Sequence, residues 1–291
     1  KKERNYFSIM DLSQDIKLIA LDLDGTLFNS QSIISKENIK AIKAASDAGV
    51  NIVISTGRPF CGDPFEQISG SGIDYSINAN GSSAYRISTG ECLFEDPLDD
   101  DVVIPVIEYL LTQRVHMDAF IKGQGYSPVK CLKDAKELSM PPSLHKYIMN
   151  TRKRVDSLVD LIKTEGHVQK MTINFPKDQN GNYYCRDEVF EYLTGNPALT
   201  VVSGGYGNLE FTKAGVDKGV GLKKLSGILN IPLDQTMAIG DTENDLAIIK
   251  SAHIGVAMGN ATEQLKADSD YITDTNDNDG VAKAIYHFLS L

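Results

Sequence analysis

A nearly continuous apolar run, IKLIALDL at residues 16–23, constrains the fold of this chain more than any other feature. Such a run is typical of a strand that is buried on both faces, as in a parallel sheet covered by helices. Ser35 can cap a following helix with apolar residues at helical spacing. A second apolar run follows at residues 50–55. The segment therefore predicts a βαβ unit with a right-handed crossover.

The same rhythm returns in the last third of the chain. Helices predicted at residues 218–229 and 243–250 precede apolar strands at 236–239 and 254–257, and a closing helix covers 279–289. The first third contains a third predicted strand and a hairpin, at residues 75–79, 85–87 and 92–94.

The middle of the chain has a different character, because helices there alternate with strands of period-2 pattern. The strands are expected at residues 115–121, 170–175 and 199–202, and the helices at 99–113, 153–165 and 187–193. We therefore predict an α/β protein in which one core, residues 1–94 and 206–291, is interrupted by an inserted α+β domain, residues 95–205.

Charge and composition exclude several classes of partner. The chain has 29 basic and 39 acidic residues and a net charge of −10, which argues against binding to nucleic acids or to an anionic membrane surface. No apolar run is long enough to span a bilayer, and the charged start KKER does not resemble a signal peptide. The four cysteines lack the spacing of a zinc site or a disulfide framework. We expect a cytoplasmic protein that is a monomer or a homodimer.

Two carboxylates, Asp22 and Asp24, follow the first apolar run in the sequence DLDGT. Carboxylates at the end of a buried strand are costly unless they are paired or bind a metal. Open α/β sheets bind ligands at this edge. The two residues therefore predict a crevice that holds a cation, although Asp-Gly is also common in turns.

Three further polar segments lie beside predicted strands. Thr56 and Gly57 follow the second strand and offer a hydroxyl and backbone N–H groups to phosphate oxygens. Lys218 begins a predicted helix, where the helix dipole disfavours a cation, so it is either solvated or faces an anion. Asp241 and Asp245 follow a later strand, where carboxylates suit either Mg²⁺ or an acidic helix cap.

Together these segments resemble the four motifs of the haloacid dehalogenase superfamily of phosphohydrolases. DLDGT at residues 22–26 resembles motif I, Thr56 with Gly57 and Arg58 resembles motif II, Lys218 resembles motif III, and GDTEND at 240–245 resembles motif IV. The insertion resembles the C2-type cap of the Cof-like sugar phosphatases. The resemblance implies a Rossmann-like parallel-sheet core that is interrupted by an inserted α+β cap domain.

The resemblance also implies roles for individual residues. Asp22 would attack phosphorus to give an aspartyl phosphate, and Asp24 would protonate the leaving alcohol and then activate water. Mg²⁺ would be bound by the Asp22 carboxylate, the Asp24 backbone carbonyl and Asp241, with Asp245 supporting the site without contacting the ion. The groups expected to bind the phosphoryl oxygens are the amides of Leu23 and Gly57 and the side chains of Thr56, Lys218 and Asn244.

Three interpretations of function remain open. The leading one is a Mg²⁺-dependent phosphatase for small phosphorylated metabolites, with sugar phosphates as the default class. A phosphomutase of the phosphomannomutase type is the second. An aspartate-phosphorylated signalling module is the third, although receiver domains are shorter and lack a large insertion. We expect the cap to supply specificity, from predicted loops at residues 122–126 and around His145, and Arg58 is a candidate contact for the leaving group.

Overall fold

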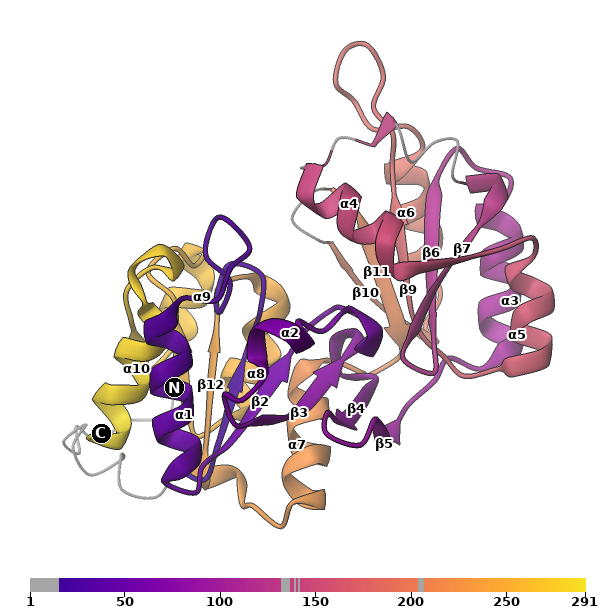
Figure 1. Ribbon diagram of the computed structural model, residues 1–291. Coiled ribbons are helices and arrows are strands. Elements are labelled where there is room, and N and C mark those ends of the chain that lie inside the picture. Colours follow the sequence, from indigo (N-terminus) through magenta and orange to yellow (C-terminus); the bar gives the residue numbers. More distant parts are fainter. Residues whose placement is uncertain (1–15, 132–136, 139, 141, 204–206) are drawn as a thin grey trace.

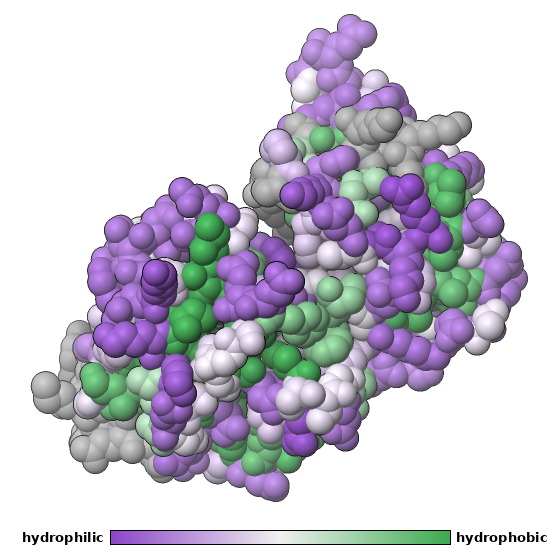
Figure 2. Space-filling view, viewed as in Figure 1, coloured by the Kyte–Doolittle hydropathy of each residue, from purple (hydrophilic) through white to green (hydrophobic). Residues whose placement is uncertain are grey.

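The computed structural model describes residues 16–131, 137, 138, 140, 142–203 and 207–291. They form two sheets, each covered by helices, and Figure 1 shows the two resulting lobes side by side. Figure 2 shows a notch between the lobes on this face. The predicted α/β fold class, with a parallel-sheet core and a second α+β unit, is confirmed.

The first sheet has eight strands, most of them parallel. Its strands are β1 (Leu18–Leu21), β2 (Asn51–Ser55), β3 (Ile73–Asn78), β4 (Ser83–Arg86), β5 (Glu91–Glu95), β12 (Thr236–Gly240), β13 (Ile254–Ala257) and β14 (Tyr271–Ile272). Their order is β14-β13-β12-β1-β2-β3-β4-β5, and only the pairs β3/β4 and β4/β5 are antiparallel. β1, β12 and β13 are buried along their whole length, as the apolar runs predict.

Helices cover both faces of this sheet. They are α1 (Lys36–Asp47), α2 (Phe65–Ile68), α7 (Lys218–Ile228), α8 (Leu246–Ser251), α9 (Glu263–Asp268) and α10 (Gly280–Leu289). The chain moves from β1 to β2 in one direction across the sheet and from β12 to β13 in the other. Right-handed crossovers therefore place α1 and α8 on opposite faces. α1 packs beside α10, and α7 packs beside α8.

The local sequence explains where α1 begins and ends. The Ser35 hydroxyl accepts a hydrogen bond from the Asn38 amide at 3.0 Å, which satisfies one of the first free N–H groups of the helix. Ala41, Ile42 and Ala45 are buried against the sheet at helical spacing. Gly49 follows the helix with a positive φ of 88°, a conformation that favours glycine.

The second sheet has six strands, all of which lie between β5 and β12 in the sequence. They are β6 (His116–Ile121), β7 (Gln124–Pro128), β8 (Arg152–Val155), β9 (Val168–Asn174), β10 (Leu199–Ser203) and β11 (Leu209–Lys213), in the order β10-β11-β9-β6-β7-β8. The helices of this lobe are α3 (Asp100–Leu110), α4 (Pro142–Thr151), α5 (Leu158–Glu165) and α6 (Arg186–Thr194). Single turns of 3₁₀ helix occur at Phe60–Gly62, Ala79–Gly81, Leu233–Gln235, Glu243–Asp245 and Asn276–Asn278.

The two faces of the second sheet differ in polarity because side chains alternate along each strand. In β6, Met117, Ala119 and Ile121 pack into the apolar core of this lobe. Asp118 lies between them in sequence, is fully buried, and is not part of that core. The face opposite to the apolar core therefore carries buried polar side chains, and this face contributes to the candidate site described below.

Several expectations for the inserted segment are wrong. The helix predicted at residues 153–165 starts only at Leu158, because Ser157 caps it by accepting from the Asp160 amide at 3.1 Å. The preceding residues form β8, whose sequence RKRV gives no apolar signal. The predicted loop at residues 122–126 mostly belongs to β7, and His145 lies on α4.

The predicted end of the insertion, between residues 205 and 206, lies outside the described residues. Strand pairing shows that β11, which lies after that boundary, joins β10 and β9 in the second sheet. The prediction that residues 206–291 all belong to the core is therefore wrong for Leu209–Lys213, whose short LEFTK pattern carries little apolar signal for a strand.

Among the described residues, no helix is both long and apolar enough to cross a membrane. All four cysteines, Cys61, Cys92, Cys131 and Cys185, are free thiols.

Candidate active site

The first sheet brings two predicted site residues to one edge. Asp22 directly follows β1, and Asp241 directly follows β12, which is the parallel neighbour of β1. The Asp22 amide continues the pairing by donating to the Ile239 carbonyl at 3.0 Å. The direction of the chain connections reverses at this pair of strands, and α/β sheets of this kind bind ligands at such a switch point.

Lys218 lies between two carboxylates. Its ammonium nitrogen is 2.7 Å from Asp22 Oδ1 and 2.6 Å from Asp245 Oδ1, and the side chain is buried. Burial alone would lower the pKa of Lys218, but the two carboxylates raise it well above its ordinary value. Of the two alternatives for this residue, the structure therefore shows a lysine that faces anions rather than solvent.

Asp245 is held by donors on both of its oxygens. Oδ1 accepts from Lys218, and Oδ2 accepts from the amides of Asp241 and Thr242 at 3.1 and 3.3 Å. Gly240 leaves room for this arrangement, because a Cβ there would come within 2.5 Å of Asp245 Cβ. The carboxylate thus ties Lys218 to the loop that follows β12.

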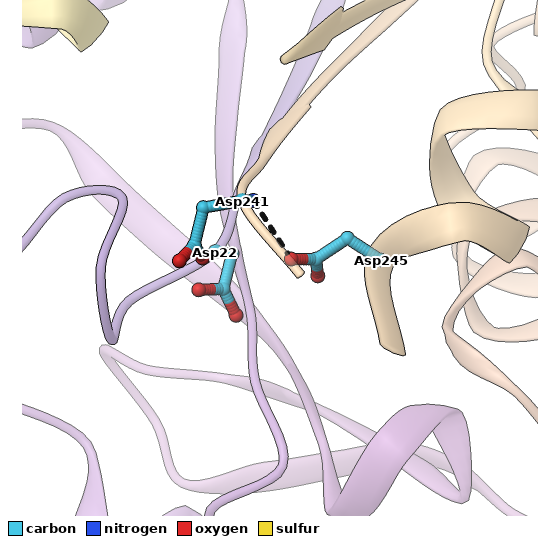
Figure 3. A group of neighbouring side chains, drawn as sticks. All are labelled: Asp22, Asp241 and Asp245. Carbon is cyan, nitrogen blue, oxygen red and sulfur yellow. Dashed lines mark hydrogen bonds between the residues drawn. The ribbon is translucent and has the colours of Figure 1, made fainter. Parts of the chain in front are cut away.

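Three carboxylates form a cluster that could hold a metal ion. One oxygen each of Asp22, Asp241 and Asp245 lies within 4.8 Å of the others, and all three residues are buried (Figure 3). Burial, together with the charge of Asp245, raises the pKa of Asp241 to about 7 and the pKa of Asp22 well above its ordinary value. These raised values fit a site built around a cation, since a bound cation would stabilise the ionised form of each carboxyl.

The DLDGT loop wraps around this cluster. Gly25 has a positive φ of 90°, and a Cβ on it would meet Asp241 Oδ2 at 2.3 Å, so the loop can approach the carboxylate only with glycine there. The Thr26 hydroxyl donates to Asp241 Oδ1 at 3.2 Å. Leu23 lies between the two aspartates of the motif with its side chain buried.

Asp24 does not join the three-carboxylate cluster. Its carboxylate is largely exposed and accepts two hydrogen bonds from Arg58, from Nε at 2.9 Å and from a terminal nitrogen at 2.6 Å. The Arg58 guanidinium in turn lies over the ring of Tyr147 of α4, 4.4 Å from its centroid. Arg58 therefore contacts the second predicted catalytic carboxylate and a residue of the inserted segment, a role that sequence reasoning did not assign to it.

Of the remaining predicted phosphate-binding residues, Asn244 lines the same pocket as Lys218, and Thr56 lies at the end of β2. Thr56 is buried at the end of β2, its amide donates to the Ile77 carbonyl and its hydroxyl accepts from the Arg58 amide at 3.2 Å. Asn244 accepts from the Thr242 hydroxyl at 2.6 Å. Asn244 and Lys218 line one pocket together with Asn80, which follows β3.

Two charged residues of the second sheet also reach this region, and sequence reasoning missed them. Lys170 of β9 and Glu210 of β11 form an ion pair of 2.6 Å. A Cβ on Gly57 would lie 3.2 Å from Lys170 Nζ, so the pair sits against the predicted phosphate-binding loop. The available signal was a lysine inside an apolar strand, because a charged residue there needs a partner.

The raised pKa of Asp241 predicts how stability depends on pH without metal. The folded protein holds a proton on Asp241 up to about pH 7, whereas the unfolded chain releases it near 3.8. Between these values the folded state binds more protons, so the free energy of unfolding falls as the pH rises, by up to about 1.4 kcal/mol per pH unit. Urea unfolding in EDTA across this window should show the slope, and Asp241→Asn should reduce it.

The surface variant Asp156→Asn is the control and should keep the slope of the wild-type protein. An Asp241→Asn protein whose pH slope equals that of the wild type would show that Asp241 does not titrate in this way.

Comparisons with known proteins identify the family of this chain. Residues 19–285 match the family model of haloacid dehalogenase-like hydrolases. The chain is 34% identical over 279 residues to the 5-amino-6-(5-phospho-D-ribitylamino)uracil phosphatase YcsE of Bacillus subtilis, covering 94% of this chain and 96% of that protein. The structure is similar to a haloacid dehalogenase-like hydrolase from B. subtilis, with a TM-score of 0.79, 29% identity and coverage of 94% and 99%.

A second solved structure is that of the subclass IIB sugar phosphatase BT4131, with a TM-score of 0.74, 25% identity and coverage of 94% of this chain and 98% of that chain. The family match spans both segments of the first sheet and the insertion between them. The chain therefore belongs to the family of haloacid dehalogenase-like hydrolases.

Proposed function

We propose that this protein is a Mg²⁺-dependent phosphatase that hydrolyses small phosphorylated metabolites through an aspartyl phosphate on Asp22. The observation that carries the proposal is the buried contact of Lys218 with Asp22 and Asp245 at the edge of the first sheet. A carboxylate can attack an anionic phosphate ester only where positive charge offsets the repulsion between them. Lys218 supplies part of that charge next to Asp22.

The donor set fits a divalent cation. Asp22 and Asp241 offer carboxylate oxygens, the ligands that Mg²⁺ prefers, and the Asp24 backbone carbonyl is the third proposed ligand. Both oxygens of Asp245 already accept hydrogen bonds from protein donors, which supports its proposed role of positioning Lys218 and the Asp241 loop. When bound, Mg²⁺ would neutralise charge between the nucleophile and the phosphate.

In the first proposed step, an Asp22 carboxylate oxygen attacks phosphorus and the bond to the leaving alcohol breaks. The amides of Leu23 and Gly57 and the side chains of Thr56, Lys218 and Asn244 would hold the three transferring oxygens. Thr56 and Lys218 are buried, and Lys218 lines the same pocket as Asn244, which supports this assignment. Such fixed donors lower the barrier because they need no reorganisation during the reaction.

Asp24 is the proposed acid and base. In the first step its carboxyl would donate a proton to the leaving oxygen, and in the second step it would take a proton from the water that attacks the aspartyl phosphate. In this structure Arg58 holds the carboxylate through two hydrogen bonds, and the exposure of Asp24 lets it exchange protons with water. For both transfers the carboxyl must turn from Arg58 toward the substrate.

Sugar phosphates are the proposed substrate class. The relative YcsE is named for a ribityl phosphate substrate, and BT4131 is described as a sugar phosphatase. The inserted domain of this chain places polar side chains against the phosphate-binding loop, which supports a role for it in selecting the alcohol part of the substrate.

The test is phosphate release from sugar phosphates, nucleotides, polyol phosphates and pyridoxal phosphate, with Mg²⁺ and with EDTA. We expect release that requires Mg²⁺ and that Asp22→Asn abolishes, because an amide is a much weaker nucleophile than a carboxylate. Asp47→Asn, on the exposed end of α1, is the control. Activity that survives intact in Asp22→Asn would contradict the nucleophile assignment. An isomerised sugar phosphate in place of free phosphate would identify a phosphomutase.

Replacing Asp24 should slow both chemical steps. We expect Asp24→Asn to lower kcat by about 10²- to 10⁴-fold, because general acid–base catalysis contributes on this scale. Rapid-quench kinetics would measure formation and breakdown of the phosphoenzyme separately. Unchanged steady-state turnover, or a loss confined to substrate binding, would count against an acid–base role.

A further inference from the structure

Lys170 and Glu210 share the polar face of the second sheet. Their neighbours in sequence, Met171, Leu209 and Phe211, point into the apolar core of the lobe, so strand alternation directs the two charged side chains to the opposite face. β9 and β11 pair directly, and the Lys170 ammonium lies 2.6 Å from Glu210 Oε2. The pair is therefore fixed by two strands rather than by a loop.

The pair contacts the first sheet at the phosphate-binding loop. Glu210 Oε2 also accepts from the Asn80 side-chain amide at 2.7 Å, and Asn80 follows β3 of the first sheet. A Cβ on Gly57 would meet Asn80 Oδ1 at 2.8 Å, Lys170 Nζ at 3.2 Å and Glu210 Oε2 at 3.6 Å. Glycine at position 57 thus allows the ion pair to approach the residues proposed to bind phosphate.

Stability alone gives a weak reason for this pair. Lys170 is fully buried, and burial lowers its pKa while Glu210 opposes that shift. Removing two charges from water is costly, and apolar side chains of similar volume often stabilise a protein as well or better. A buried pair beside a candidate active site is therefore better explained by what it can bind.

Glu210 retains the capacity to accept another hydrogen bond. A carboxylate has roughly four acceptor positions. Lys170 and Asn80 use Oε2, and Asn208 donates to Oε1 at 3.2 Å. Glu210 lines the pocket that also contains Lys218 and Asn244, and Thr200 of β10 forms part of the same wall. A hydroxyl near the phosphate ester would therefore find an anionic acceptor here.

We propose that Glu210 is a specificity-determining residue that accepts a hydrogen bond from a hydroxyl of the substrate's alcohol part, and that Lys170 is a positioning residue that orients Glu210. The inference rests on the proposed phosphatase function and names the group that would contact the alcohol part of the substrate. Esters with a hydroxyl close to the phosphate are favoured over esters whose alcohol part has no hydrogen-bond donor. No new covalent step is involved.

The test compares Glu210→Gln with the wild-type protein on esters of both kinds. The hydroxylated probes are glycerol 3-phosphate, ribose 5-phosphate and glucose 6-phosphate, and the probe without a donor is p-nitrophenyl phosphate. We expect kcat/KM for the best hydroxylated ester to fall by about 10- to 100-fold, as for loss of a hydrogen bond to a charged group, and kcat/KM for p-nitrophenyl phosphate to change by less than about threefold.

Lys170→Met tests the positioning role. It should raise KM for the hydroxylated ester more than it lowers kcat. The double variant with Glu210→Gln should lose no more kcat/KM on this ester than the more impaired of the two single variants, because both substitutions act on one contact. The matched control is the exposed pair Lys43 and Asp47 on α1 of the other lobe, 3.0 Å apart, changed to Lys43→Met and Asp47→Asn. Both control variants should keep wild-type discrimination between the two kinds of ester.

Different failures have different meanings. Equal losses on both kinds of ester, or no loss on either, would overturn the role of Glu210 and leave a structural contact between the lobes. A wild-type protein that hydrolyses only p-nitrophenyl phosphate would also overturn it. A wild-type protein that hydrolyses none of these esters with Mg²⁺ would instead overturn the proposed function. If Lys170→Met does not fold, as thermal unfolding would show, Glu210→Gln decides the question, since Gln has nearly the same shape as Glu.

Discussion

The contact of buried Lys218 with Asp22 and Asp245 connects the parts of the candidate active site. The lysine comes from the start of α7, one carboxylate follows β1, and the other ends the 3₁₀ turn before α8. None of these charges is tolerable alone in a buried position, since an unpaired buried charge costs several kcal/mol. The ion pairs therefore require the three segments to meet, and their meeting places Asp241 beside Asp22.

The parallel pairing of β1 and β12 brings these segments to one edge of the first sheet. β1 and β12 are parallel neighbours, so the residues after them emerge at the same edge, and the helices on the two faces leave that edge open to a ligand. Glycine at positions 25 and 240 lets the backbone lie close to the carboxylates, because side chains there would collide with Asp241 and Asp245. The inserted lobe meets the same edge through Tyr147 beside Arg58 and through Glu210 beside Asn80.

The central strands of the first sheet, and the positions of Asp22 and Asp241 directly after two of them, could be predicted from sequence because their signals are local. An apolar run followed at once by a carboxylate identifies β1 with Asp22, and the same pattern identifies β12 with Asp241. The inserted domain was harder to predict. The strand RKRV carries no apolar alternation, and β11 is a short strand whose pairing with β9 depends on residues about forty positions away. Lys170 and Glu210 become neighbours only through that pairing, and a single sequence contains no signal for it.

The proposed chemistry depends on Asp22 becoming phosphorylated, and borohydride trapping during turnover tests this most directly. Borohydride reduces an aspartyl phosphate to homoserine, and peptide mass mapping locates the modified position. The account predicts homoserine at position 22, formed only when both substrate and Mg²⁺ are present. Unmodified Asp22 under conditions where the trap works and phosphate is being released, or homoserine at another aspartate, would contradict it.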